Sequence, residues 1–76
     1  MINFYKVSGV SFDKQKMKLS INNQKYEFDL AKISPRLLRA NQEERNNFEI
    51  SPSGYGIRWP LIDEDLSIDG LLKFVK

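Results

Sequence analysis

Apolar and polar residues alternate in two neighbouring segments of the first half of the chain. The apolar positions are 17, 19 and 21 in residues 16–22, and 26, 28 and 30 in residues 25–30. An alternation of period two predicts strands with one face in the core and the other in water. Asn22 and Asn23 lie between the segments, and asparagine tolerates the positive φ angles of a two-residue hairpin turn. We therefore predict an antiparallel hairpin.

The side chains of this hairpin favour one register. The pairs that it creates are Leu19 with Tyr26, Met17 with Phe28, and Lys18 with Glu27. Apolar side chains then face apolar ones and a cation faces an anion, which stabilises a strand pair. A slip by two residues would keep the same faces inward, so that register stays an alternative.

A preceding strand is expected over about residues 4–12. Its apolar positions are odd at first (5 and 7) and even later (10 and 12), with Ser8 and Gly9 at the change. One extra residue reverses the faces of a strand, and glycine often occupies such a bulge. Residues 13–15 then turn the chain into the next strand, which completes a three-stranded meander.

Capping signals predict short helices in the middle of the chain. Ser34 followed by Pro35 matches an N-cap with proline at the first helical position. Asn41, with Glu44 three residues later, matches a capping box. Residues 35–47 therefore form either one helix or two short ones divided near Asn41, and we favour two.

The last third predicts two short strands and a final helix. Residues 48–50 and 57–59 flank a turn rich in glycine and proline, and Pro60 ends the second strand. Ser67 is the expected cap of a helical turn over residues 68–74. The predicted fold class is α+β with a small, mainly antiparallel sheet: a three-stranded N-terminal meander, short C-terminal strands, one or two short helices and a short C-terminal helix.

Length and composition limit the chemistry. A chain of 76 residues forms one domain, residues 1–76. It has no cysteine and no histidine, which removes disulfides, thiolate catalysis and the commonest general base and metal ligand. Its apolar runs are far shorter than the about 20 residues that span a bilayer, and its start lacks the apolar stretch of a secretory signal. We expect a cytoplasmic, non-enzymatic protein with no cofactor, no bound metal and no membrane segment.

The charges are mixed. Of 12 basic and 10 acidic residues, residues 1–46 hold nine and five, and residues 47–76 hold three and five. The densest basic group, expected on the outer face of the hairpin, is Lys14, Lys16, Lys18 and Lys25. Glu27 and Asp29 share that face and offset it, so nucleic-acid binding is not the expected function.

Asp63, Glu64 and Asp65 form the densest acidic run. A helix–loop–helix calcium site would need glycine at the sixth place and glutamate at the twelfth, where this chain has Ile68 and Phe74. We interpret the run, together with the nearby Asp69, as acidic residues just before and within the first turn of the helix that Ser67 caps, where they suit its positive end.

Trp59, the only tryptophan, lies close in sequence to Tyr55 and Arg58. It either anchors the core through its ring and indole N–H, or contributes to a binding surface, because Trp, Tyr and Arg dominate interface hot spots. In a strand, Arg58 lies on the opposite face from Trp59. The candidate partner contacts are Tyr55, Arg58, Trp59, Asp63, Glu64 and Asp65.

The run of residues 54–72, together with residues 33–37 and the Asn22-Asn23 turn, resembles the bacterial "domain of unknown function 2442" family. Relatives often carry histidine where this chain has Arg58. The resemblance implies a small α+β domain and carries over no catalytic residues. Stand-alone members often lie beside a second small protein, an arrangement that resembles a toxin–antitoxin pair. We therefore expect a protein-interaction module with a small protein partner, and the alternative is a nucleic-acid-associated regulatory domain.

Overall fold

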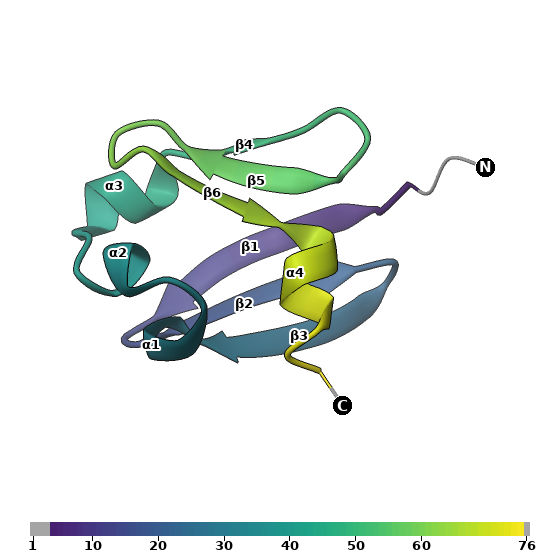
Figure 1. The fold of residues 1–76 in the computed structure, drawn as a ribbon, viewed down its shortest axis with the longest axis horizontal. Coiled ribbons are helices and arrows are strands. Elements are labelled where there is room, and N and C mark those ends of the chain that lie inside the picture. Colours follow the sequence, from purple (N-terminus) through teal and green to yellow (C-terminus); the bar gives the residue numbers. More distant parts are fainter. Residues whose placement is uncertain (1–3, 76) are drawn as a thin grey trace.

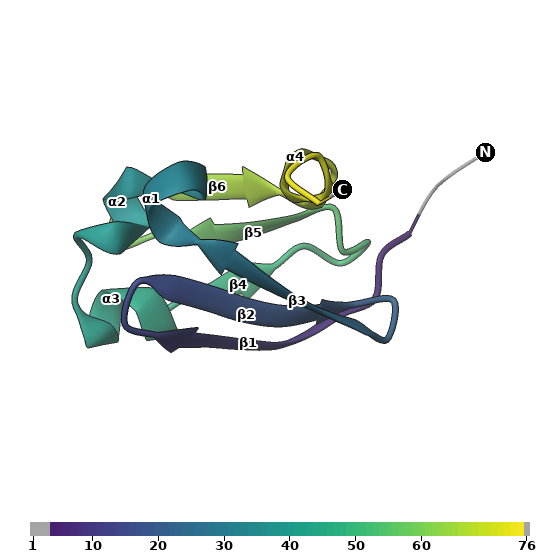
Figure 2. The same cartoon turned by 90° about the horizontal axis from the view of Figure 1, so that it is seen from below.

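Two antiparallel sheets of three strands each pack on one core in a computed structural model that describes residues 4–75 (Figures 1 and 2). The first sheet has the order β1 (Val7–Asp13), β2 (Lys16–Ile21), β3 (Gln24–Asp29), and the second has the order β4 (Glu49–Ile50), β5 (Gly56–Trp59), β6 (Glu64–Ser67). The helices are α1 (Leu30–Ile33), α2 (Pro35–Leu38), α3 (Gln42–Asn46) and α4 (Ile68–Leu72). Figure 1 shows α1, α2 and α3 gathered at one end. The predicted α+β class is confirmed. Among residues 4–75, no helix is long and apolar enough to cross a bilayer.

The predicted hairpin is β2–β3, in the favoured register. Leu19 pairs with Tyr26 and Lys18 with Glu27, so the slipped alternative is wrong. Asn22 and Asn23 have φ angles of 53° and 70°, as a two-residue turn between twisted strands requires. Alternating burial along β2 confirms the predicted faces.

β1 contains the predicted bulge, because its pairing with β2 shifts between Ser8 and Ser11 and Gly9 has a φ of 64°. The strand begins at Val7, later than the expected start near residue 4. Lys6 still bonds to the turn after β2, since its carbonyl accepts from the Asn22 N–H at 2.8 Å, but the Tyr5 backbone N–H donates to the Ser53 carbonyl at 3.1 Å.

Two short helices, α2 and α3, occupy residues 35–47 as favoured. The Ser34 hydroxyl accepts from the Leu37 N–H, and Asn41 forms a complete capping box with Glu44. Helix α1 was not predicted, since Leu30 continues the strand alternation. The Asp29 side chain caps it by accepting from the Ala31 N–H at 3.0 Å.

The acidic run lies in a turn and in a strand, β6, that the sequence did not predict, and β6 directly precedes helix α4. Asp63 lies in a turn with a φ of 53°, and Glu64 and Asp65 belong to β6, paired with Trp59 and Arg58 of β5. The ladder to β5 pairs the backbone N–H and C=O groups of this segment. Helix α4 begins directly after the predicted cap Ser67, and Asp69 lies in its first turn, as the sequence predicts.

Trp59 is a core residue. Its side chain is 0% exposed, its ring lies 6.4 Å from Phe12 and 6.2 Å from Phe48 between centroids, and its indole N–H donates to the Arg45 carbonyl at 2.9 Å. The other core side chains are Met17, Leu19, Ile21, Phe28, Leu30, Leu37, Ile57, Ile68 and Leu71. This resolves the alternatives for Trp59, and its inclusion among the candidate surface contacts was wrong, because strand alternation turns it inward.

Candidate functional site

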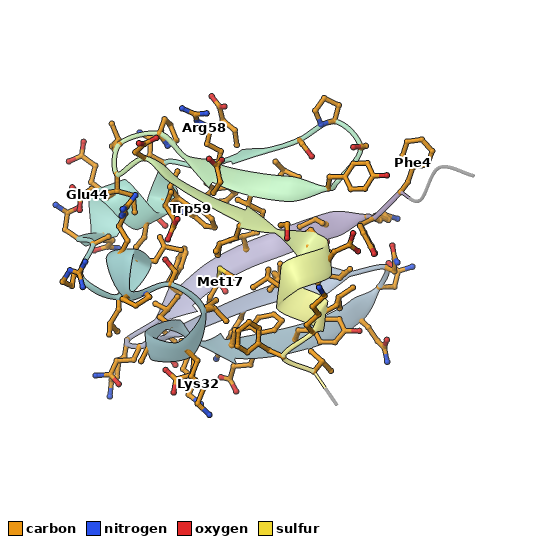
Figure 3. The ribbon with its side chains drawn as sticks, in the orientation of Figure 1. Phe4, Met17, Lys32, Glu44, Arg58 and Trp59 are labelled. Atoms are coloured by element: carbon orange, nitrogen blue, oxygen red, sulfur yellow. The ribbon has the colours of Figure 1, made fainter. Side chains whose placement is uncertain are left out.

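The outer face of the second sheet carries a row of three charged side chains. Arg58 of β5 pairs with Glu49 of β4 on one side and with Asp65 of β6 on the other. All three residues are exposed. Figure 3 shows Arg58 and Trp59 on opposite sides of β5. The row is therefore the polar counterpart of the buried face that holds Ile57 and Trp59.

A groove of about 530 Å³ lies along this face. Its lining includes Pro52, Tyr55, Arg58 and Asp65. Ile50 and Leu66 also border it, although both pair with the buried Ile57 and pack partly against the core. Tyr55 is 45% exposed although its ring is large and mostly apolar. We name these residues, with Glu49, the second-sheet groove. It combines apolar surface with a few charged groups, which is typical of binding sites.

Tyr55 is held by the N-terminal segment. Its ring meets the ring of Tyr5 edge-on, with centroids 6.5 Å apart and an interplanar angle of 79°. The Tyr5 hydroxyl donates to the Asp69 carboxylate of α4, and this hydrogen bond raises the pKa of Tyr5. Three distant parts of the chain thus position one aromatic side chain at the end of the groove.

Gly54 brings the loop before Tyr55 against the same segment. It has a φ of 73°, and a Cβ atom there would lie 1.8 Å from the Tyr5 carbonyl oxygen. Only glycine allows this approach without a shift of the backbone. The loop that carries Tyr55 is therefore fixed by close backbone packing.

Arg58 has carboxylates on both neighbouring strands, yet it forms no ion pair within 4.0 Å with any residue of the described part of the chain. The ion pairs found there belong to Lys18, with Asp13 at 3.7 Å and Glu27 at 4.0 Å. The Arg58 guanidinium is therefore available to a carboxylate from outside the domain.

The members of the acidic run point in different directions. Glu64 turns inward, where one carboxylate oxygen accepts from the Ser34 hydroxyl and the other from the Asp65 N–H. Asp63 lies in the turn before β6, where its carbonyl accepts from Arg36 at 2.7 Å. Only Asp65 reaches the groove. Within residues 4–75, no cluster of three or more histidine, cysteine, aspartate or glutamate side chains could hold a metal ion.

The structure thus brings together three of the six candidate contacts: Tyr55, Arg58 and Asp65. Sequence reasoning missed Glu49, Pro52 and Leu66. Glu49 could have been predicted as a member of the site. The two predicted strands, residues 48–50 and 57–59, form a hairpin in which Glu49 lies opposite Arg58. Leu66 gave no such signal, because β6 was not predicted.

The fold defines a small α+β protein with two three-stranded antiparallel sheets. Residues 7–76 match the model of the family "Protein of unknown function (DUF2442)", and the chain belongs to this family, as its sequence predicted. A crystal structure of a protein of unknown function from Rhodospirillum rubrum ATCC 11170 is similar, with a TM-score of 0.73 and 24% identity over 96% of this chain and 90% of that one. That likeness shows the fold alone. No protein with a curated description matches the chain.

Proposed function

We propose that this protein is a non-enzymatic interaction module that binds a small protein partner at the second-sheet groove, as the antitoxin-like member of a two-gene pair. The observation that carries the proposal is the pairing of an exposed tyrosine with an exposed arginine in one groove. Tyrosine and arginine are enriched among the residues that dominate binding energy.

The charges of the groove define the partner's chemistry. Arg58 is central, with Glu49 and Asp65 on either side. A complementary surface presents a carboxylate to Arg58, flanked by lysine or arginine, and an apolar side chain beside Tyr55. Complementary charges of this kind select the partner and fix its orientation more than they add affinity.

Binding is favoured over catalysis by the residue types available. The whole chain has no histidine and no cysteine, so acid–base or nucleophilic chemistry would have to come from weaker candidates. A nucleic-acid role would depend on the lysines of the first sheet, where Lys18 lies near two carboxylates. The proposed function therefore rests on the second sheet.

The proposal is tested by thermal unfolding with and without the product of the adjoining gene. A partner at about 100 times its dissociation constant stabilises the domain by about 2.7 kcal/mol. For a chain of this length, that raises the melting temperature by roughly 10–20 °C. Arg58→Ala and Tyr55→Ala should reduce this rise, while Lys16→Ala, on the outer face of the other sheet, should leave it unchanged.

Two results would count against the proposal. One is an unchanged melting temperature at saturating partner, together with no co-purification. The other is a rise that Arg58→Ala and Tyr55→Ala leave intact although both variants are folded, which would place the partner on another surface.

A further inference from the structure

Strand β3 forms an edge of the first sheet. Among residues 4–75 its strand partner is β2 alone, and in Figure 1 it runs along the lower border of the sheet. It has six residues, no proline and an uninterrupted register with β2. Proteins usually shorten, bulge or cover such an edge, because its backbone groups can pair with another strand. β3 is neither shortened nor interrupted by a bulge.

The direction of the backbone groups follows from the register. The Leu30 N–H donates to the Gln15 carbonyl at 2.8 Å and so continues the β2–β3 ladder. Bonding residues alternate along an antiparallel ladder, so Phe28 and Tyr26 bond toward β2. Lys25 and Glu27 alternate with these residues along the strand. Their backbone N–H and C=O groups therefore point to the free edge.

The charges on this edge are self-complementary. Two copies of β3 that run antiparallel about a two-fold axis at Tyr26 place Lys25 of each copy opposite Glu27 of the other. In a register centred on Lys25 or on Glu27, that residue lies opposite the same residue of the other copy. In a register centred on Phe28, Glu27 of one copy lies opposite Asp29 of the other. Like charges directly opposite destabilise a strand pair. Of these registers, only the one centred on Tyr26 avoids them.

We propose that two copies of this chain pair through β3 in that register and form one continuous six-stranded sheet. Lys25 of each copy then exchanges backbone hydrogen bonds with Glu27 of the other copy. These are the residues whose backbone groups point to the free edge. The two Tyr26 residues form the intervening pair without hydrogen bonds, where side chains approach most closely. Tyr26 is partly buried and stacks on Phe28 with centroids 6.2 Å apart, so its ring is already oriented.

This association does not depend on the proposed function. β3 and the second-sheet groove belong to different sheets. Each copy in the dimer keeps its own groove, so the dimer presents two. Loss of the dimer and loss of partner binding are therefore separate results.

Sedimentation velocity from micromolar to millimolar concentration tests the pairing. The chain should show a concentration-dependent dimer. Lys25→Glu and Glu27→Lys should each weaken it at least about tenfold, because two symmetry-related pairs change from attraction to repulsion. The matched controls are Lys73→Glu and Glu43→Lys, which make the same charge changes at exposed positions outside β3.

The decisive sample is an equimolar mixture of the two β3 variants. Glutamates at 25 and 27 in one copy then face lysines at 27 and 25 in the other, so the mixture should form a heterodimer although each variant alone is mostly monomeric. Amide hydrogen exchange gives a second readout: the Lys25 and Glu27 amides should become protected only at concentrations that form the dimer.

Folding of the variants is not at risk, because the Lys18–Glu27 pair that Glu27→Lys removes is exposed and such pairs contribute little. Three results overturn the proposal. They are a chain that stays monomeric throughout, a dimer that neither β3 variant weakens, and a mixture that does not associate.

Discussion

The two sheets are stabilised in different ways. The strands of the first sheet are joined by two-residue turns, and its pairs lie close together along the chain. The second sheet has strands of two to four residues, and distant segments hold it in place: Tyr5 bonds to Ser53, and Ser34 to Glu64. The first sheet is a local structure, whereas the second depends on what packs beneath and around it.

Arg45 of α3 joins the two regions. Its guanidinium donates to the carbonyls of Leu37, Leu38 and Lys14 at 3.0, 3.1 and 2.7 Å. It also lies over the ring of Phe12 in β1, 5.4 Å from the centroid. Its own carbonyl accepts from the Trp59 indole. One residue of a five-residue helix therefore connects the β1–β2 turn, α2 and the second sheet.

The largest expected effect is that of Trp59→Ala. Truncating a buried tryptophan costs about 3–5 kcal/mol, a large part of the about 4–11 kcal/mol expected for a chain of this length. Amides of β5 and β6 should lose protection from hydrogen exchange before those of β2 and β3, because Trp59 anchors the second sheet. Denaturant unfolding and native-state exchange measure both quantities. Equal loss of protection in the two sheets would contradict the difference between them.

Leu19→Ala tests the core side of the first sheet. It should lower the free energy of unfolding by about 2–5 kcal/mol, because Leu19 is buried. Lys18→Ala, the next residue on the exposed face, should change it by less than about 1 kcal/mol. Chemical denaturation of the two variants makes the comparison, and similar losses would refute the assigned faces.

Two glycines with positive φ, one in each region, separate local strain from long-range packing. A Cβ atom at Gly9 would meet nothing within 4 Å, while one at Gly54 would clash with the Tyr5 backbone. Gly9→Ala should cost about 1–2 kcal/mol from the left-handed backbone alone. Gly54→Ala should cost roughly 1–3 kcal/mol more, because the N-terminal segment must move. Equal losses of unfolding free energy would show that the Tyr5 contact does not support the second sheet.

The smallest effect is expected for Tyr5→Phe. The hydrogen bond to Asp69 raises the pKa of Tyr5 in the folded state. This hydrogen bond therefore stabilises the folded state below the ordinary tyrosine pKa of about 10, and the stabilisation is lost as the pH rises through the raised pKa of Tyr5. The variant should melt slightly below the wild type at neutral pH, and the gap should close in alkaline solution. A gap that is unchanged across this pH range would assign the effect to packing instead.

The sequence by itself determined the parts whose signals are local. Alternation set the faces of β2 and β3. The Asn22-Asn23 turn and the cross-strand charges favoured their register over a slip by two residues, and Ser34 and Asn41 favoured two middle helices over one. The pair of Tyr55 and Arg58 as a candidate site also came from the sequence, through residue type and proximity.

Only the tertiary structure decided the parts that depend on distant partners. The segment of β6 is rich in aspartate and glutamate, which have low strand propensity. It forms a strand because its backbone pairs with β5 and because the Glu64 carboxylate accepts a hydrogen bond from the Ser34 hydroxyl. The sequence around Trp59 is compatible with a core position and with a surface position. Its burial follows from its contacts with Phe12, Phe48 and the Arg45 carbonyl. No pattern of period two or 3.6 encodes such contacts, because they join residues whose spacing along the chain is arbitrary.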